Sequence, residues 1–119
     1  GGSYSGGGLA QQVDNPYELR RPRPRVAVLV DNAVASSGEA TFIAFIKRPN
    51  TRSFGIGTCG LSTANRGFTL SDGALLNLTV STMADRTKFK YGDRVMPDEL
   101  ITDAGQMEQR AIAWLLSGS

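Results

Sequence analysis

The sequence predicts a single α/β domain, and three observations support this class. A continuous run of β-branched and aliphatic residues, Val26–Val30, is typical of a buried strand and precedes an apolar helical segment. An Asp-Gly pair at positions 72 and 73 separates two strand-like runs, and apolar residues at helical spacing close the chain. With 119 residues, 40% of them hydrophobic, the chain is long enough for one domain that mixes strands and helices.

The N-terminal segment is rich in glycine. Residues 1–8 contain five Gly, two Ser and one Tyr, a composition typical of a flexible loop and also of a turn that brings backbone close to a ligand. We expect residues 1–14 to form a flexible Gly-rich segment and residues 15–119 to form the domain. Because the chain opens with Gly1 and not with Met, we expect its start to be processed, trimmed or taken from within a longer reading frame.

A basic, proline-containing stretch precedes the first predicted strand. Arg20, Arg21, Arg23 and Arg25 alternate with prolines at positions 22 and 24, which favour an extended backbone over a basic helix. Such a stretch could contact phosphate or an acidic peptide. A solvated approach to the next strand is the favoured interpretation, because an isolated basic run is a weak signal.

The next segment predicts a strand, a turn and a helix. Val26–Val30 is expected to be buried on both faces, as in a parallel sheet covered by helices. Ser36, Ser37 and Glu39 supply hydroxyl caps and an acid for the start of a helix. The helix continues through Ala40–Ile46, which is apolar on nearly every side, so we expect it to be deeply buried.

The remaining elements follow from turn signals and periodicity. Residues 53–56 are strand-like, and the Asp-Gly turn predicts a hairpin in which Leu76, Leu78 and Val80 share one face. Asp103 and Gln106 resemble a capping box before an amphipathic final helix that ends near Gly118.

Composition excludes several classes of function. One Cys and no His exclude a disulfide framework, a Cys-cluster zinc site and a Ser-His-Asp triad built from this chain alone. We expect no cofactor and no metal, since no P-loop or dinucleotide fingerprint is present. The net charge of +2 gives no reason to expect a nucleic-acid partner. No apolar run approaches the ~20 residues that a membrane span requires, and the sequence assigns no compartment.

Ser36 is the candidate for chemistry. It lies where a strand leads through small residues to a helix N-terminus, whose free amides and dipole can hold the oxyanion formed when a hydroxyl attacks an acyl group. The same pattern also fits two serines that only cap a helix.

The order of several motifs resembles the carboxyl-terminal processing (tail-specific, tricorn-like) serine peptidases. The motifs comprise the strand and Ala-Ser-Ser-Gly-Glu turn of residues 26–39, the Gly-x-Gly-Thr-x-Gly run of 55–60, Asp72-Gly73, Tyr91-Gly92 and Pro97-Asp98. Each motif alone is a weak signal for the family, but their order and spacing together are fairly specific. The resemblance covers roughly residues 15–101.

The resemblance implies a partial core domain and a set of site residues. The fold would be a truncated ClpP/crotonase-like β-β-α core with a β-hairpin and a C-terminal helix. Ser36 would be the nucleophile, with the Ser37 amide and Gly2 as oxyanion donors. Nearby support would come from four positions, Glu39, Thr58, Cys59 and Gly60. Glu39 could face Ser36 or balance the helix N-terminus, and Cys59 is expected to be a small buried filler and not a reactive thiol.

The general base of the family is missing. Leu61 occupies the position of the Lys base, and the His base of the tricorn-like branch has no equivalent because the chain lacks His. The family's upstream strands and its peptide-binding insert are also absent. We therefore expect peptide-bond hydrolysis through Ser36 only if a base is supplied, and weak or no activity in this chain alone.

These departures from the family pattern leave two alternative functions open and predict that the chain associates with another chain. A non-catalytic remnant could bind peptides or serve as an oligomeric structural module, and a nucleic-acid binder using residues 20–25 ranks last. Missing strands would leave an open sheet edge, so we expect a homo-oligomer or a partner chain.

Overall fold

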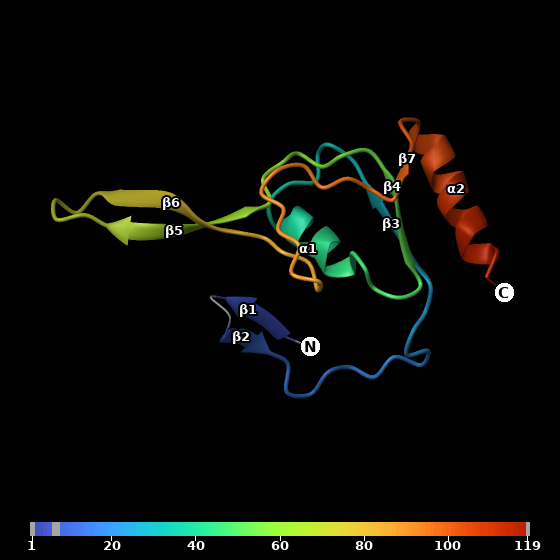
Figure 1. Ribbon diagram of the computed structural model, residues 1–119, viewed down its shortest axis with the longest axis horizontal. Coiled ribbons are helices and arrows are strands. Elements are labelled where there is room, and N and C mark those ends of the chain that lie inside the picture. Colours follow the sequence, from blue (N-terminus) through green and yellow to red (C-terminus); the bar gives the residue numbers. More distant parts are fainter. Residues whose placement is uncertain (1, 6–7, 119) are drawn as a thin grey trace.

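The computed structural model describes residues 2–5 and 8–118, and Gly1, Gly6, Gly7 and Ser119 lie outside the described residues. It confirms an α/β chain with a β-hairpin and a C-terminal helix (Figure 1). The elements in chain order are β1 (Gly2–Ser5), β2 (Gly8–Gln12), β3 (Val26–Val30), α1 (Ser37–Phe45), β4 (Thr51–Gly55), β5 (Thr63–Thr69), β6 (Leu75–Thr82), β7 (Glu99–Leu100) and α2 (Ala104–Leu116).

The central sheet is parallel and has the order β3-β4-β7. Val28 lies beside Ser53 on one face, and Leu29 lies beside Phe54 on the other, because neighbouring residues in a parallel register share a face. Val28 packs with the core residues of α1, whereas Phe54 contacts Trp114 of α2 with ring centroids 6.0 Å apart. The two helices therefore cover opposite faces of the sheet.

The buried core is small. Val30, Phe42, Ile43 and Val95 form its main cluster, and Phe54 is fully buried on the other face. The prediction that Val26–Val30 is buried on both faces is wrong for most of the strand, since only Val30 is buried and Leu29 is 45% exposed. The reason is that β3 has one neighbouring strand, β4, in the sheet that the described residues form.

Helix α1 is also less buried than predicted. It buries Glu39, Phe42 and Ile43, while Ala40, Ala44 and other residues of the opposite side are exposed. The described part of the chain buries one side of this helix, so an apolar composition on all sides does not produce burial on all sides. The deep burial expected from composition is therefore corrected to a one-sided contact.

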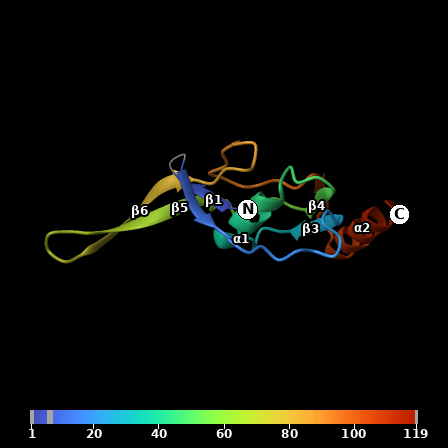
Figure 2. The ribbon, with the colours of Figure 1, turned by 90° about the horizontal axis from the view of Figure 1, so that it is seen from below.

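The predicted hairpin is confirmed as the antiparallel pair β5–β6, with Phe68 opposite Leu76 and Arg66 opposite Leu78. Leu76, Leu78 and Val80 share one face, as the alternation predicts. Figures 1 and 2 show this hairpin projecting away from the body of the molecule, whose extents are 60 × 36 × 21 Å. Both strands are exposed along almost their whole length.

The Gly-rich segment differs from the expected loop. β1 and β2 form an antiparallel pair, with Gly2 opposite Gln12 and Ser5 opposite Gly8, so a hairpin replaces the loop in this part of residues 1–14. Main-chain hydrogen bonds define a strand pair, and glycine supplies them as well as any other residue. The flexibility of this segment stays a prediction.

Helix α2 begins and ends as the sequence predicts. The Asp103 side chain accepts a hydrogen bond from Gln106 N at 2.8 Å and caps the helix. Met107, Ala111 and Trp114 lie toward the sheet, while Ile112 and Leu116 are exposed. Within the described residues no helix is long and apolar enough to cross a bilayer.

Candidate functional site

Ser36 occupies a strained turn between β3 and α1. Its φ of 52° and ψ of −109° lie in a region that residues with a Cβ rarely adopt, at a cost on the order of 1–3 kcal/mol. The residue is exposed, and its carbonyl accepts from Ala40 N at 2.9 Å as the helix begins. A strained serine on a sharp strand-to-helix turn is the arrangement that presents a nucleophile in many hydrolases.

Glu39 holds this turn from inside the protein. Its carboxylate is fully buried and accepts four hydrogen bonds. Oε2 accepts from Ser36 N at 2.9 Å and Leu61 N at 2.8 Å, whereas Oε1 accepts from Thr58 Oγ1 at 2.6 Å and Gly60 N at 2.9 Å. Ser36 and Glu39 form a capping box at the start of α1. Glu39 therefore holds the backbone of Ser36 from inside the protein.

The charge of Glu39 is favoured in spite of burial. Burial raises the pKa of this carboxyl, but hydrogen bonds from Thr58, Gly60, Ser36 and Leu61 outweigh it, and the pKa lies below its ordinary value. An anion with a lowered pKa and both oxygens occupied is a poor proton acceptor. Glu39 is thus a positioning residue. The expectation that it could face Ser36 is met by its contact with the backbone N–H of Ser36.

The loop of residues 58–61 is fastened to the Ser36 turn. Besides its bond to Glu39, Thr58 Oγ1 accepts from Val95 N at 2.9 Å, and Cys59 N donates to Val34 O at 2.8 Å. The structure thus brings together four of the predicted positions, Ser36, Glu39, Thr58 and Gly60. Cys59 joins them through its backbone, but the expectation of a buried filler is wrong, since the thiol-bearing residue is exposed.

The two predicted oxyanion donors differ in their support. The Ser37 amide is the first of α1, and in the described part of the chain no hydrogen bond occupies it, whereas Gly38 N donates to Ala35 O at 2.9 Å. Gly2 lies in β1 and pairs with Gln12. Its role as a second donor stays a prediction.

No side chain in this cluster is a recognisable general base for Ser36. Leu61, at the position of the family's Lys, donates its backbone N–H to Glu39, and its aliphatic side chain is 54% exposed. The described residues also contain no cluster of His, Cys, Asp or Glu suited to a metal ion. The geometry presents a serine and an amide, and it requires a base from elsewhere.

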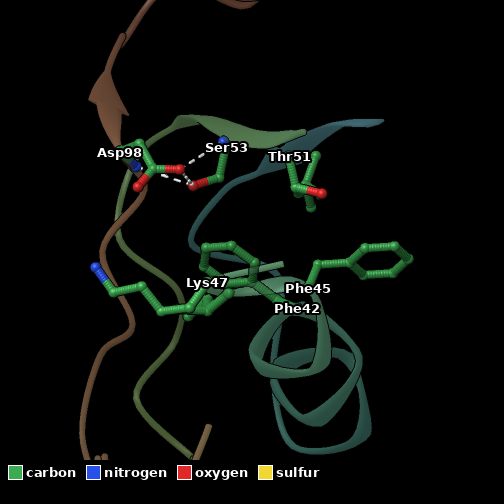
Figure 3. Close-up of a pocket in the computed structure, with 8 residues that line it drawn as sticks. Phe42, Phe45, Lys47, Thr51, Ser53 and Asp98 are labelled. Carbon is green, nitrogen blue, oxygen red and sulfur yellow. Dashed lines mark hydrogen bonds between the residues drawn. The ribbon is translucent and has the colours of Figure 1, made fainter. Parts of the chain in front are cut away.

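A cavity of about 110 Å³ lies apart from the serine, between the end of α1 and β4 (Figure 3). Its polar side is built by Asp98, whose Oδ2 accepts from Ser53 N and Ser53 Oγ, both at 2.8 Å. These bonds give Asp98 a structural role beside β4. The cavity is lined by Val28, Phe42, Phe45, Ile46, Lys47, Thr51, Ser53 and Asp98, and Ser36 is not among them.

Sequence patterns did not single out two buried polar residues, Ser62 and Asp85. Ser62 Oγ donates to Asp93 O at 2.6 Å and accepts from Gly92 N at 2.8 Å. Asp85 accepts from Thr87 and from Tyr91 Oη and organises the loop after β6. The Asp-x-Thr spacing is a usable local signal for the second, because such pairs form side-chain turns.

This chain is similar over most of its length to a known protein family and to individual proteins. The profile of peptidase family S41 matches residues 5–101. A nisin-resistance protein of Lactococcus lactis subsp. lactis is 29% identical over 116 residues, which is 98% of this chain and 35% of that protein. This chain therefore spans about a third of the curated relative.

Two solved structures share the fold. A lipoprotein from Streptococcus agalactiae superposes with a TM-score of 0.68 at 36% identity, over 80% of this chain and 32% of the lipoprotein. A protein described as a candidate peptidase, from Parabacteroides merdae ATCC 43184, gives a TM-score of 0.60 at 20% identity over 80% of this chain and 33% of the other, and it supports the fold alone.

The profile match covers most of the residues, so the chain belongs to peptidase family S41.

Proposed function

We propose that this chain is the nucleophile-bearing part of a serine peptidase, with Ser36 as the nucleophile. The observation that carries the proposal is the strained, exposed turn in which Ser36 is held by a fully buried carboxylate. A serine that only caps a helix does not need the positive φ, because a normal N-cap has β-region geometry.

The chemistry would be acyl transfer. Ser36 Oγ attacks the peptide carbonyl, a base takes the hydroxyl proton, and the resulting oxyanion accepts from the Ser37 amide at the positive end of α1. The proton then passes to the leaving amine, and water releases the acyl group from Ser36. We infer that the base comes from outside these 119 residues, in a longer polypeptide or a partner chain.

The truncated ClpP/crotonase-like core belongs to the same proposal. Its support is the parallel sheet with helices on both faces and the serine at the start of α1. Because one relative is a nisin-resistance protein, nisin is the first peptide to test as a substrate.

The test is labelling of the 119-residue chain with a fluorophosphonate probe, followed by intact mass. We expect one adduct, formed at least tenfold faster when imidazole is added as a soluble base. The adduct should be lost in Ser36→Ala and kept in Ser37→Ala, the matched control that retains the backbone amide. An equal rate in Ser36→Ala, or no adduct with imidazole on folded protein, would refute an activated serine here.

One observation favours a second candidate, a non-catalytic peptide-binding module. Leu61 stands at the position of the base, and the chain has no His. This candidate predicts that nisin or another extended peptide binds equally well to the chain and to Ser36→Ala, without cleavage of the peptide. Calorimetric binding together with mass analysis of the peptide distinguishes the two candidates.

A further inference from the structure

The loop after β4 runs beside the turn that carries Ser36. β3 and β4 are parallel, and beyond the ends of both strands Cys59 N donates to Val34 O at 2.8 Å. The two segments therefore keep the same direction past the sheet. Two residues farther along each of them, the residue beside Ser36 is Leu61.

A single carboxylate oxygen limits the distance between Ser36 and Leu61. Glu39 Oε2 accepts from Ser36 N at 2.9 Å and from Leu61 N at 2.8 Å, so the two nitrogens are no farther apart than the sum of these lengths. Glu39 is fully buried and holds both residues from the interior, whereas Ser36 and Leu61 are both exposed. The two residues are thus neighbours on the outer side of this turn.

The backbone around Leu61 is fixed on both sides, although its side chain is 54% exposed. Before it, Gly60 N donates to Glu39 Oε1 at 2.9 Å. After it, the buried Ser62 donates its hydroxyl to Asp93 O at 2.6 Å. Single exposed leucines are ordinary on protein surfaces. This one differs because main-chain hydrogen bonds hold it beside the candidate nucleophile, so contact with a ligand would order little additional backbone.

We propose that Leu61 contacts the substrate side chain next to the scissile bond and selects an aliphatic residue there. This inference rests on the proposed role of Ser36 as the nucleophile. A peptide whose carbonyl carbon reaches Ser36 Oγ must place its neighbouring residues against the surface around Ser36, and Leu61 belongs to that surface. Contact between two aliphatic groups removes both from water, whereas a charged substrate side chain would lose hydration there without gaining a partner.

Two charged residues lie close to the same loop. A Cβ added at Gly60 would lie 2.9 Å from Asp93 Oδ1 and 3.3 Å from Arg94 Cγ. Their charges are opposite, so together they give no net reason to prefer an acidic or a basic substrate. The side chain at position 61 is therefore the feature that distinguishes substrates here, and a charge placed at this position should change the preference.

The first test compares two diphenyl phosphonate probes that differ only in carrying a leucine-like or a glutamate-like side chain, with imidazole as the soluble base. Ser36 Oγ bonds to phosphorus, phenoxide leaves, and imidazole takes the hydroxyl proton. We expect the leucine-like probe to label the 119-residue chain about tenfold faster, the scale that an apolar contact gives. Leu61→Arg should reverse this ratio, and its guanidinium stays protonated and cannot act as a base.

The ratio of the two rates is the readout, because a change in folding or in the reactivity of Ser36 would alter both rates alike. Leu78→Arg is the matched control, since Leu78 is 46% exposed and lies in β6 of the hairpin. It should keep the ratio of the parent chain. A ratio that is the same in the parent chain, Leu61→Arg and Leu78→Arg would overturn the inference and leave Ser36 in place as the nucleophile.

The second test measures recognition without chemistry. Two extended peptides that differ in one central residue, Leu or Glu, are titrated calorimetrically into Ser36→Ala. We expect tighter binding of the Leu peptide, and loss of this preference in the double variant Ser36→Ala/Leu61→Arg. If no Ser36-dependent adduct forms but Leu61 still decides the peptide preference, the proposed nucleophile fails and recognition by Leu61 stands. Absence of both an adduct and peptide binding would overturn both proposals.

Discussion

Glu39 connects the candidate site to the rest of the protein. Its carboxylate accepts from the backbone of Ser36, Gly60 and Leu61 and from the Thr58 hydroxyl, with two donors on each oxygen. The sequence indicated that Glu39 could face Ser36 or balance the helix N-terminus, where the helix dipole favours an acid. Its bond to Ser36 N is local, but its other three donors lie 19 to 22 residues away, and no local pattern reveals them.

Replacement of Glu39 tests this role at the residue scale. Glu39→Gln keeps the size but replaces one accepting oxygen with a donor, so two N–H or O–H groups lose their partners. We expect the free energy of unfolding to fall by about 3 kcal/mol, since hydrogen bonds to buried charged groups contribute about 1.5–3 kcal/mol each. Urea denaturation measures the loss, and Glu108→Gln on the exposed face of α2 should change stability by less than about 0.5 kcal/mol.

The same carboxylate predicts a dependence of stability on pH. The pKa of Glu39 is lower in the folded chain than its unfolded value of about 4.5, so the unfolded state binds the proton more readily. Its contribution is complete above the unfolded pKa and is lost as pH falls through the folded pKa. Below pH 4.5, Glu39→Gln should show a flatter slope of stability against pH than the parent chain. Equal slopes would contradict a lowered pKa.

Tyr91 offers a second, spectroscopic test. Burial, a hydrogen bond to Asp85, and the negative charges of Asp85 and Asp98 raise the pKa of this phenol from 10.0 to about 12. The chain contains three Tyr, so phenolate absorbance should show a late titration step that is missing in Tyr91→Phe. Because the folded pKa is raised, the contribution of Tyr91 to stability is complete below pH 10 and is lost as pH rises toward 12. A late step that persists in Tyr91→Phe would assign it elsewhere.

At the scale of elements, the strand, turn and helix around Ser36 were predictable, because their signals are local. Val26–Val30, the serines before Glu39 and the Asp-Gly hairpin all match the structure within a few residues. The contacts that satisfy the C-terminal carbonyls of α1 were not predictable. Arg86 Nη2 donates to Ala44 O at 2.7 Å and Arg86 Nε to Ile46 O at 3.1 Å, which satisfies helix carbonyls from a distant loop.

Gly55, at the end of β4, allows β3 and β4 to approach closely, and its replacement tests this. Its φ is +130°, and an added Cβ would meet Val30 O of the neighbouring strand at 1.9 Å. Gly55→Ala should destabilise the chain by about 3 kcal/mol or more, because backbone must move to relieve the overlap. Gly67→Ala, in the exposed hairpin with Leu75 at 3.6 Å as nearest contact, is the matched control and should cost far less. Thermal unfolding compares the two, and equal losses would contradict this account.

At the scale of the whole molecule, the chain presents apolar surface that its own elements do not cover. The β5–β6 hairpin carries Leu76, Leu78 and Val80 on one exposed face, and β3 has an open edge. An isolated two-stranded hairpin is marginally stable in water, so such a surface is expected to be covered in the functional protein.

The sequence by itself determined the class of the fold, the order of most elements, the family and the position of Ser36. These properties depend on periodicity, turn residues and motif spacing, which are local in the chain. Only the tertiary structure decided that Glu39 also anchors the 58–61 loop, that Cys59 is exposed and that β3 has one buried residue. Burial and hydrogen-bond partners depend on which distant segments meet, and local patterns carry no information about such meetings.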